Sequence, residues 1–331
     1  MRVFITGGAG YCGSRLVPKL LAMGHEVTVF DIMYFGANHL GTHSRLNIIQ
    51  GDIRDAEHIR TSCKGHDIFI SLACISNDAS FELNEELSTS INLEAFEPMV
   101  VAAKDAGCSR FIYASSSSVY GVSEAPDVTE DHPLVPLTLY NKYKGQCEPL
   151  LAKHTDESFV GVTFRPATVC GYAPRLRLDL SVNILTNHAV NRQKITVFGG
   201  EQLRPNLHVE DYCDAVVLLM NAPKHLVADE IFNVGFQNMS IFDIAALVQK
   251  VVGEEFPEFG LVEIERTTSD DNRSYHINSD KIRETLGFTP QFSIEDAIRD
   301  LCQAFKNGLV PNSLTDDLYF NVKRLLGSDA K

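Results

Sequence analysis

Tyr140 and Lys144 are the residues of this 331-residue chain whose types and spacing are best suited to chemistry. They lie four positions apart in the segment 139–154, whose pattern predicts a helix, so their side chains share one helix face. A lysine ammonium beside a phenol favours the phenolate. Lowering a tyrosine pKa from about 10 towards about 7 requires roughly 4 kcal/mol, which a close cation and a cofactor charge can supply in a partly desolvated cleft. Such a phenolate removes a hydroxyl proton while the carbon gives up a hydride.

A run of four serines, 115–118, strengthens this hypothesis. It follows the apolar segment 110–114, which predicts a strand, and enzymes built on parallel sheets bind ligands at the carboxyl ends of their strands. A serine hydroxyl there can hold the reacting oxygen. An isolated Tyr-x-x-x-Lys spacing also fits an ordinary amphipathic helix, and Tyr143 competes with Tyr140, although Cys147 stands where its lysine would be.

A glycine-rich segment, TGGAGYCG at 6–13, predicts a cofactor site. It joins the predicted strand 2–6 to the predicted helix 14–23, so its backbone N–H groups and the helix dipole can bind a pyrophosphate. Asp31 ends the second predicted strand, where a carboxylate binds ribose hydroxyls and disfavours a 2′-phosphate, which favours NAD over NADP. A solvated strand-end carboxylate is the alternative for Asp31. Asp52 can meet the adenine amino group or cap a turn.

The elements that position these residues alternate between strand and helix in the first half of the chain. Short apolar strands between helices predict an α/β fold, a doubly wound Rossmann sheet with both faces covered. The regular pattern loosens after residue 165. We expect an NAD-binding domain over 1–165, with returning segments from the second half, and a smaller α/β substrate lobe over 166–331. The expected strands are 2–6, 26–30, 46–50, 67–72, 110–114 and 159–164, and the expected helices are 14–23, 86–106, 139–154, 211–221, 240–252, 279–286 and 294–306.

Composition excludes several other classes. The net charge is −14 and no basic run occurs, which argues against nucleic-acid binding. No apolar stretch is long enough to span a membrane, and the N-terminus lacks the pattern of a signal peptide. The eight cysteines are scattered without a C-x-x-C pair, so we expect no metal site and reduced thiols in the cytoplasm.

Taken together, these motifs resemble those of the extended short-chain dehydrogenases/reductases, in the group of NAD-dependent nucleotide-sugar epimerases and dehydratases. The resemblance covers nearly the whole chain. It is carried by TGGAGYCG, Asp31, Gly51-Asp52-Ile53, Leu72-Ala73, Asn92, SSSSVYG, YNKYK, FRPATVCG, RPNLHVED and LGFTP, in that order.

The resemblance implies roles for individual residues. Tyr140 would be the general base, Lys144 its partner and a ribose ligand, and Ser116 the hydroxyl that holds the substrate oxygen. The implied cofactor ligands are Gly7, Gly10, Tyr11, Cys12, Gly13, Asp31, Asp52, Ile53, Leu72, Ala73, Asn92, Tyr140, Lys144 and Pro166. The implied ligands of a nucleotide-sugar substrate are Ser117, Ser118, Arg175, Arg177, Asn183, Arg204 and Arg273.

Some of these assignments have structural alternatives. Arg175 and Arg177 can instead anchor a loop to acidic neighbours, and Arg273 can form a surface ion pair with Asp270 or Asp271. The resemblance also implies a homodimer, packed through the helices predicted at 86–106 and 139–154.

Departures from the group narrow the reaction. Ser117 and Ser118 stand where similar 4,6-dehydratases carry an Asp-Glu pair, and similar decarboxylases keep a glutamate at the second position. Similar 3,5-epimerases use a cysteine in this loop, which has none. The reaction that remains is oxidation at the sugar C4. The serine run before Val119-Tyr120-Gly121 favours a UDP-glucose 4-epimerase-like enzyme, whereas 173–183 resembles a subgroup that includes GDP-heptose 4-dehydrogenase. A 4-dehydrogenase or 4-keto reductase is therefore an alternative, and a non-catalytic NAD-binding scaffold is a third.

Overall fold

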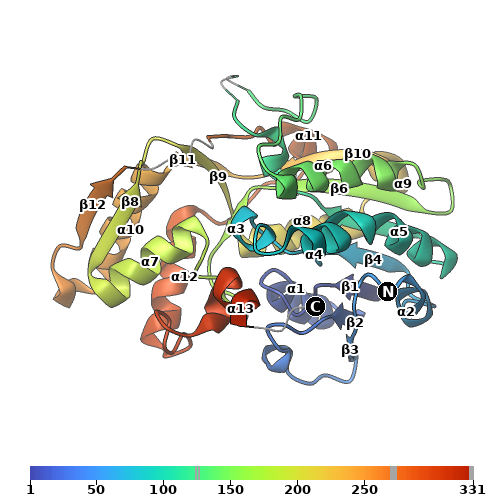
Figure 1. Ribbon diagram of the computed structural model, residues 1–331, viewed down its shortest axis with the longest axis horizontal. Helices are drawn as coiled ribbons and strands as arrows, with labels where there is room; N and C mark the ends of the chain where they lie inside the picture. The colour runs from blue at the N-terminus through green and yellow to red at the C-terminus, as the bar shows by residue number, and fades with distance from the viewer. Residues whose placement is uncertain (124, 126, 269–273, 328–331) are drawn as a thin grey trace.

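A sheet of seven parallel strands forms the centre of the protein, in the order β10-β6-β5-β4-β1-β2-β3 (Figure 1). The computed structural model describes residues 1–123, 125, 127–268 and 274–327. This strand order confirms the predicted doubly wound Rossmann fold. The strands are β1 (Arg2–Thr6), β2 (Glu26–Asp31), β3 (Leu46–Gln50), β4 (Ile68–Ser71), β5 (Arg110–Ala114), β6 (Val160–Pro166) and β10 (Glu230–Val234).

Helices cover both faces of this sheet. Its central strands β4 and β5 are mainly apolar and are buried along their whole length, as parallel strands covered on both faces require. One face packs on α1, α8 and α11, and the other on α2, α5 and α6. The strand order reverses between β1 and β4, and this switch point opens a crevice at their carboxyl ends. The helices are α1 (Gly13–Ala22), α2 (Ala56–Ser62), α5 (Phe96–Asp105), α6 (Leu139–Ala152), α8 (Val209–Asn221) and α11 (Asp280–Leu286), with short α3 (Asp78–Phe81), α4 (Glu85–Thr89) and α9 (Lys224–Val227).

The continuous helix predicted over 86–106 is wrong. Helix α4 ends at Thr89, a π-helical turn covers Ser90–Glu94, and α5 begins at Phe96. The turn directs Asn92 inward, where its side chain accepts a hydrogen bond from the Ile75 N–H and donates one to the Ile75 carbonyl, both at 2.9 Å. These tertiary bonds fix the loop after β4 and compensate for the interrupted helix.

The second half of the chain builds a smaller part beside the large sheet and also returns β10, α8 and α11 to that sheet (Figure 1). Its core lies between three helices and a two-stranded sheet. Two helices here, α7 and α13, are absent from the sequence-based prediction. The elements are α7 (Ser181–Arg192), α10 (Ile241–Glu255), α12 (Ile294–Lys306) and α13 (Asn321–Gly327), with β8 (Lys194–Phe198) paired to β12 (Glu263–Thr267), and β9 (Leu203–His208) between β7 (Thr168–Cys170) and β11 (Gln237–Ser240).

None of the helices in the described ranges is both long and apolar enough to cross a membrane. All eight cysteines are free; six are buried, and Cys12 and Cys74 are half-buried.

Candidate functional site

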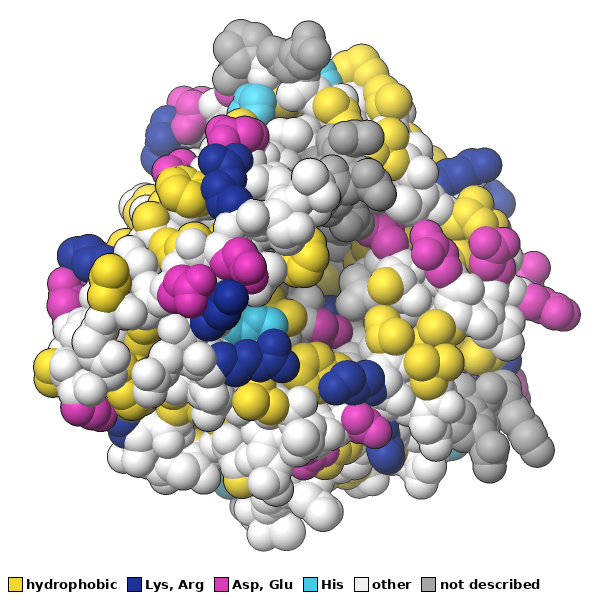
Figure 2. All heavy atoms as spheres, turned by 60° about the vertical axis from the view of Figure 1, so that its left-hand side comes forward, with side chains coloured by type: hydrophobic (Ala, Val, Ile, Leu, Met, Phe, Trp, Pro, Cys, Tyr) yellow, Lys and Arg dark blue, Asp and Glu magenta, His cyan; other side chains and the backbone are white. Residues whose placement is uncertain are grey.

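A cavity of about 700 Å³ opens along the carboxyl ends of β1, β2, β4, β5 and β6 and continues towards α7 and β8. Figure 2 shows the surface hollowed near the middle of one face, with basic side chains gathered beside the hollow. The cavity brings together most of the predicted site. The predicted residues that line it are Gly7, Gly10, Tyr11, Cys12, Gly13, Asp31, Asp52, Ile53, Leu72, Ala73, Ser116, Ser117, Ser118, Tyr140, Lys144, Pro166, Arg175, Arg177 and Arg204.

The glycine-rich loop fits a dinucleotide. Gly7 has a φ of +73°, and a Cβ there would lie 2.6 Å from the Ala73 backbone nitrogen. A Cβ at Gly13, where α1 begins, would overlap the Gly8 carbonyl. Only glycines allow this close packing of loop, helix and strand end, and it leaves the amino end of α1 facing the cavity. That arrangement is the one that binds a pyrophosphate.

Asp31 is held in place rather than solvated. Its carboxylate accepts hydrogen bonds from the Ala9 N–H at 3.1 Å and the Met33 N–H at 2.9 Å, and burial raises its pKa. It therefore ties the glycine-rich loop to the end of β2 and lines the cavity there. Asp52 also lines the cavity, but it accepts from the Arg54 N–H and is paired with the Arg54 guanidinium. The structure therefore shows Asp52 as a turn cap that also lines the cavity, and its contact with the adenine amino group stays a prediction.

Tyr140 and Lys144 lie one turn apart on α6 and both line the cavity. Thr138 caps this helix by accepting a hydrogen bond from the Asn141 N–H at 3.3 Å. The Lys144 Nζ donates to the Ala114 carbonyl at 2.8 Å, which ties α6 to the end of β5. Tyr143 faces a different neighbourhood: its hydroxyl lies 3.5 Å from the Thr89 Oγ1, and its ring packs edge-on against Phe81.

The serine run provides a chain of hydroxyl groups. The Ser118 Oγ donates to the Asn141 Oδ1 at 2.6 Å and lies 2.7 Å from the Ser116 Oγ. Since the amide oxygen can only accept, the hydroxyl of Ser116 donates to that of Ser118. Ser117 is buried, and Ser115 donates to the buried Glu148 carboxylate at 2.6 Å.

Burial raises the pKa of Tyr140 well above its usual value, and Cys74 adds to this shift. The cation that most opposes it is Arg177, and not Lys144 as expected from the helix spacing. The net shift of the Tyr140 pKa is therefore upward, and a further positive charge such as that of a nicotinamide would favour the phenolate.

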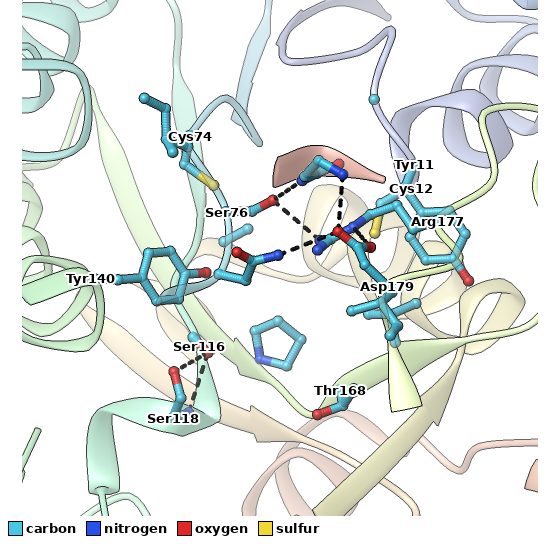
Figure 3. Close-up of a pocket in the computed structure, with 18 of the residues that line it drawn as sticks. Tyr11, Cys12, Cys74, Ser76, Ser116, Ser118, Tyr140, Thr168, Arg177 and Asp179 are labelled. Atoms are coloured by element: carbon cyan, nitrogen blue, oxygen red, sulfur yellow. Dashed lines mark hydrogen bonds and ion pairs between the residues drawn. The ribbon is translucent and has the colours of Figure 1, made fainter. Parts of the chain in front are cut away.

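Arg175 and Arg177 follow β7 and turn towards the cofactor crevice. Arg177 donates through Nε to the Asp179 carboxylate at 2.9 Å and through Nη1 to the Ser76 hydroxyl at 3.1 Å. In Figure 3, Ser76, Arg177 and Asp179 lie between Tyr140 on one side and Cys12 on the other.

A model of the NAD dependent epimerase/dehydratase family matches residues 3–235. The chain belongs to this family. Its cofactor is therefore NAD, for which the glycine-rich loop and Asp31 are suited.

Relatives within the family differ in their reactions. A low-salt glycan biosynthesis protein of Haloferax volcanii is 28% identical over 306 residues, covering 90% of this chain and 96% of its own. A UDP-glucose 4-epimerase of Lactobacillus helveticus is 26% identical over 326 residues, covering 90% and 95%. The crystal structure of a dTDP-glucose 4,6-dehydratase from Streptomyces venezuelae, with NAD bound, superposes with a TM-score of 0.83 at 22% identity, covering 96% of this chain and 100% of that one. The last likeness shows the fold alone. Because the relatives carry different activities in their names, family membership leaves the reaction of this chain open.

Among the described residues, two of the predicted site residues, Asn92 and Asn183, do not line the cavity. Asn92 is buried, and its amide is used by the Ile75 backbone, so it positions the loop after β4 and does not line the cavity. Asn183 is buried too: it accepts from the Gly171 N–H and donates to the Arg177 carbonyl and the Tyr11 hydroxyl. Arg273 lies outside the described residues.

Sequence reasoning missed several polar residues of the cavity wall. The residues in the loop after β4 could have been predicted as ligands, because ligands bind where the strand order reverses. Asp179 had a signal too, as an acid two positions from Arg177. Asn321 had none, since it reaches the site from the far end of the chain. The missed residues include Cys74, Ser76, Asn77, Asp78, Thr168, Asp179 and Asn321.

Proposed function

We propose that the protein is an NAD-dependent nucleotide-sugar 4-epimerase that oxidises the sugar at C4 through Ser116, Tyr140 and Lys144. One observation carries this proposal. The chain of hydroxyl groups from Ser116 through Ser118 to Asn141 occupies the loop beside Tyr140 in which similar dehydratases carry an acidic pair.

The residues divide the work of C4 oxidation among them. The Tyr140 hydroxyl, once ionised, takes the proton of the sugar 4-hydroxyl, and Lys144 adds a positive charge from the same helix face. Ser116 would hold the same oxygen by turning its hydroxyl proton from Ser118 to the substrate. NAD, bound beside these residues, would supply the hydride acceptor for oxidation at C4 and the hydride donor for the return step. In an epimerase the hydride returns to the opposite face of the 4-keto sugar, and Tyr140 gives the proton back to the oxygen.

The loop also argues against dehydration. Loss of water between C5 and C6 needs an acid and a base beside the sugar C6. Position 117 is a buried serine, and the hydroxyl of Ser118 is directed to Asn141. Asp78 lines the cavity, but it accepts a hydrogen bond from Thr138 at 2.5 Å, and its neighbour Asn77 reaches Asp179.

The sugar nucleotide would occupy the end of the cavity near β8 and β9. Arg204 lies there on β9, with its guanidinium 5.6 Å from the Tyr275 ring centre, and is the proposed ligand of the substrate diphosphate. Ser117 and Ser118 would contact the sugar, and Arg273 would be a second ligand of the diphosphate. The wall at this end also includes Thr196, Phe198 and Gln202.

A panel of UDP-, GDP-, CDP- and dTDP-sugars tests the proposal, with a trace of enzyme and no added NAD. Proton NMR should show many turnovers to a sugar inverted at C4. Product that stops near one per active site would instead make the enzyme a 4-dehydrogenase, the alternative favoured by segment 173–183. A 4-keto-6-deoxy product would overturn the proposal.

The family resemblance further suggests a homodimer, and we propose that α5 and α6 form its interface. Sedimentation equilibrium measures the mass directly. A species of twice the chain mass of 36.7 kDa is expected, and a monomer at all concentrations would contradict it.

A further inference from the structure

Arg175 and Arg177 contact the cofactor side of the cavity. The Arg175 N–H donates to the Ser14 hydroxyl on α1 at 3.2 Å, and its guanidinium lies 3.6 Å from the centre of the Phe35 ring, beyond β2. Arg177 reaches Ser76, beyond β4. These partners follow the three strands whose ends form the dinucleotide crevice, whereas Arg204 lies on β9.

Each of the two arginines has a buried N–H group that meets no hydrogen-bond partner among the residues the structure describes. These groups are the Nε of Arg175 and the Nη2 of Arg177, on side chains of residues that are 5% and 9% exposed. Arg177 donates a hydrogen bond to the Asp179 carboxylate. Arg175 instead donates to the uncharged amide oxygen of Asn321, at 2.6 Å. Burial and the neighbouring Arg177 lower the pKa of Arg175 to about 9. A buried guanidinium with an unmet N–H is costly unless an anion binds it, so this pair needs a ligand of negative charge.

A diphosphate is the anion that fits best. Cys12 belongs to the glycine-rich loop. Burial raises the pKa of its thiol, and the Arg177 guanidinium lies close enough to oppose this shift. It also lies near Tyr140 (Figure 3). A ligand between these residues sits where the loop and the amino end of α1 bind a pyrophosphate, and a planar guanidinium pairs well with phosphate oxygens.

The C-terminal helix α13 is joined to the same cluster. The Asn321 side chain donates to the Ser76 hydroxyl at 2.9 Å, and its N–H donates to Asp179 at 3.1 Å. Arg324 donates to the Tyr34 carbonyl at 2.7 Å, and both Asn321 and Leu325 line the cavity. Helix α13 therefore forms a wall of the crevice that rests on the arginine cluster and on the loops after β2 and β4.

We propose that Arg177 is a ligand of the diphosphate of NAD, and not of the sugar nucleotide, and that Arg175, Asp179 and Asn321 latch α13 over the bound dinucleotide. The cluster thereby keeps the same NAD in place from one turnover to the next. Retention of NAD does not depend on which reaction follows, so a failure here and a failure of C4 epimerisation are distinguishable.

The test replaces Arg177 by glutamine and by lysine and measures NAD itself. Two quantities are needed: the NAD retained per chain after prolonged dialysis, and the rate at which bound NAD dissociates. The dissociation rate should rise at least tenfold in Arg177→Gln and less in Arg177→Lys, which keeps the charge. Arg283→Gln, which changes an exposed arginine on α11 paired with Asp280, is the matched control and should release NAD at the wild-type rate.

Calorimetry with UDP, GDP, CDP and dTDP on protein saturated with NAD separates the two ligands. The affinity for the preferred nucleoside diphosphate should change less than twofold in Arg177→Gln. If that affinity falls tenfold while NAD dissociates at the wild-type rate, Arg177 is a substrate ligand and the proposal is wrong.

Asn321→Ala tests the latch without changing charge, and it keeps the proposal testable if Arg177→Gln does not fold. NAD dissociation should accelerate severalfold in this variant. Dissociation at the wild-type rate would show that α13 does not hold the dinucleotide.

Discussion

Two tyrosines three positions apart on α6 differ in their surroundings, and this difference is testable. Tyr140 lines the cavity, whereas Tyr143 packs against Phe81 and Thr89. Tyr140→Phe removes the proposed base, so turnover should fall about a hundredfold to ten-thousandfold, the usual contribution of a general base. NAD should still bind. Tyr143→Phe is the matched control.

Steady-state rates and the NAD content of both variants check this prediction. Equal losses in the two variants would assign the effect to the helix and not to Tyr140. Unchanged biological output in Tyr140→Phe would support a scaffold that only binds NAD.

The ionisation of Tyr140 gives a second prediction at this scale. Burial raises its pKa well above the ordinary value of 10.0, so in protein stripped of NAD it should stay protonated past pH 10. NAD brings a positive charge, which stabilises the phenolate and lowers the pKa. The ultraviolet difference spectrum of tyrosinate, wild type minus Tyr140→Phe, should shift to lower pH on adding NAD. Ionisation of Tyr140 below pH 10 without NAD would contradict this.

At the scale of the elements, a buried ion pair holds β6 to α6 directly behind the site. Arg165 contacts the Glu148 carboxylate through two nitrogens, at 3.0 and 2.6 Å, and both side chains are 3% exposed. Ser115 donates to the same carboxylate. The pair therefore links the serine run to the helix that carries Tyr140 and Lys144.

Glu148→Ala should lower the free energy of unfolding by about 3–5 kcal/mol, because it leaves a buried guanidinium without its partner. Urea denaturation measures this. Glu57→Ala, which removes an exposed ion pair with Arg60 on α2, is the control and should leave the unfolding midpoint nearly unchanged. Similar small effects in both variants would mean that Arg165 finds another partner or that water reaches it.

For the molecule as a whole, local signals and long-range contacts explain what the sequence could and could not predict. Strands such as Arg110–Ala114 were predicted to the residue, because a short apolar run between turns is a local signal. The glycine-rich loop and the Tyr140–Lys144 pair were likewise predicted from local spacing. The break at Ser90–Glu94 was not, because the bonds of Asn92 to Ile75 compensate for it across the fold.

The arginines show the same limit at the site. The resemblance of segment 173–183 implied that they are substrate ligands, but the choice between substrate and cofactor depends on partners far away in the chain. The hydrogen bond of Arg175 to Asn321 spans 146 residues, and no periodicity or spacing marks it. The sequence therefore predicted residues that line the cavity, and the chemistry and the ligand of each one stay predictions.

The central claim is that hydride leaves C4 and returns to C4, and a substrate carrying deuterium at C4 tests it most directly. NMR of the product made by a trace of enzyme should show an inverted C4 that still carries the deuterium, since Tyr140 exchanges only the oxygen-bound proton. Deuterium found at C6 of a deoxy sugar would reveal a dehydratase. Deuterium lost from the sugar with product limited to one per active site would reveal a dehydrogenase, and either result would contradict the account.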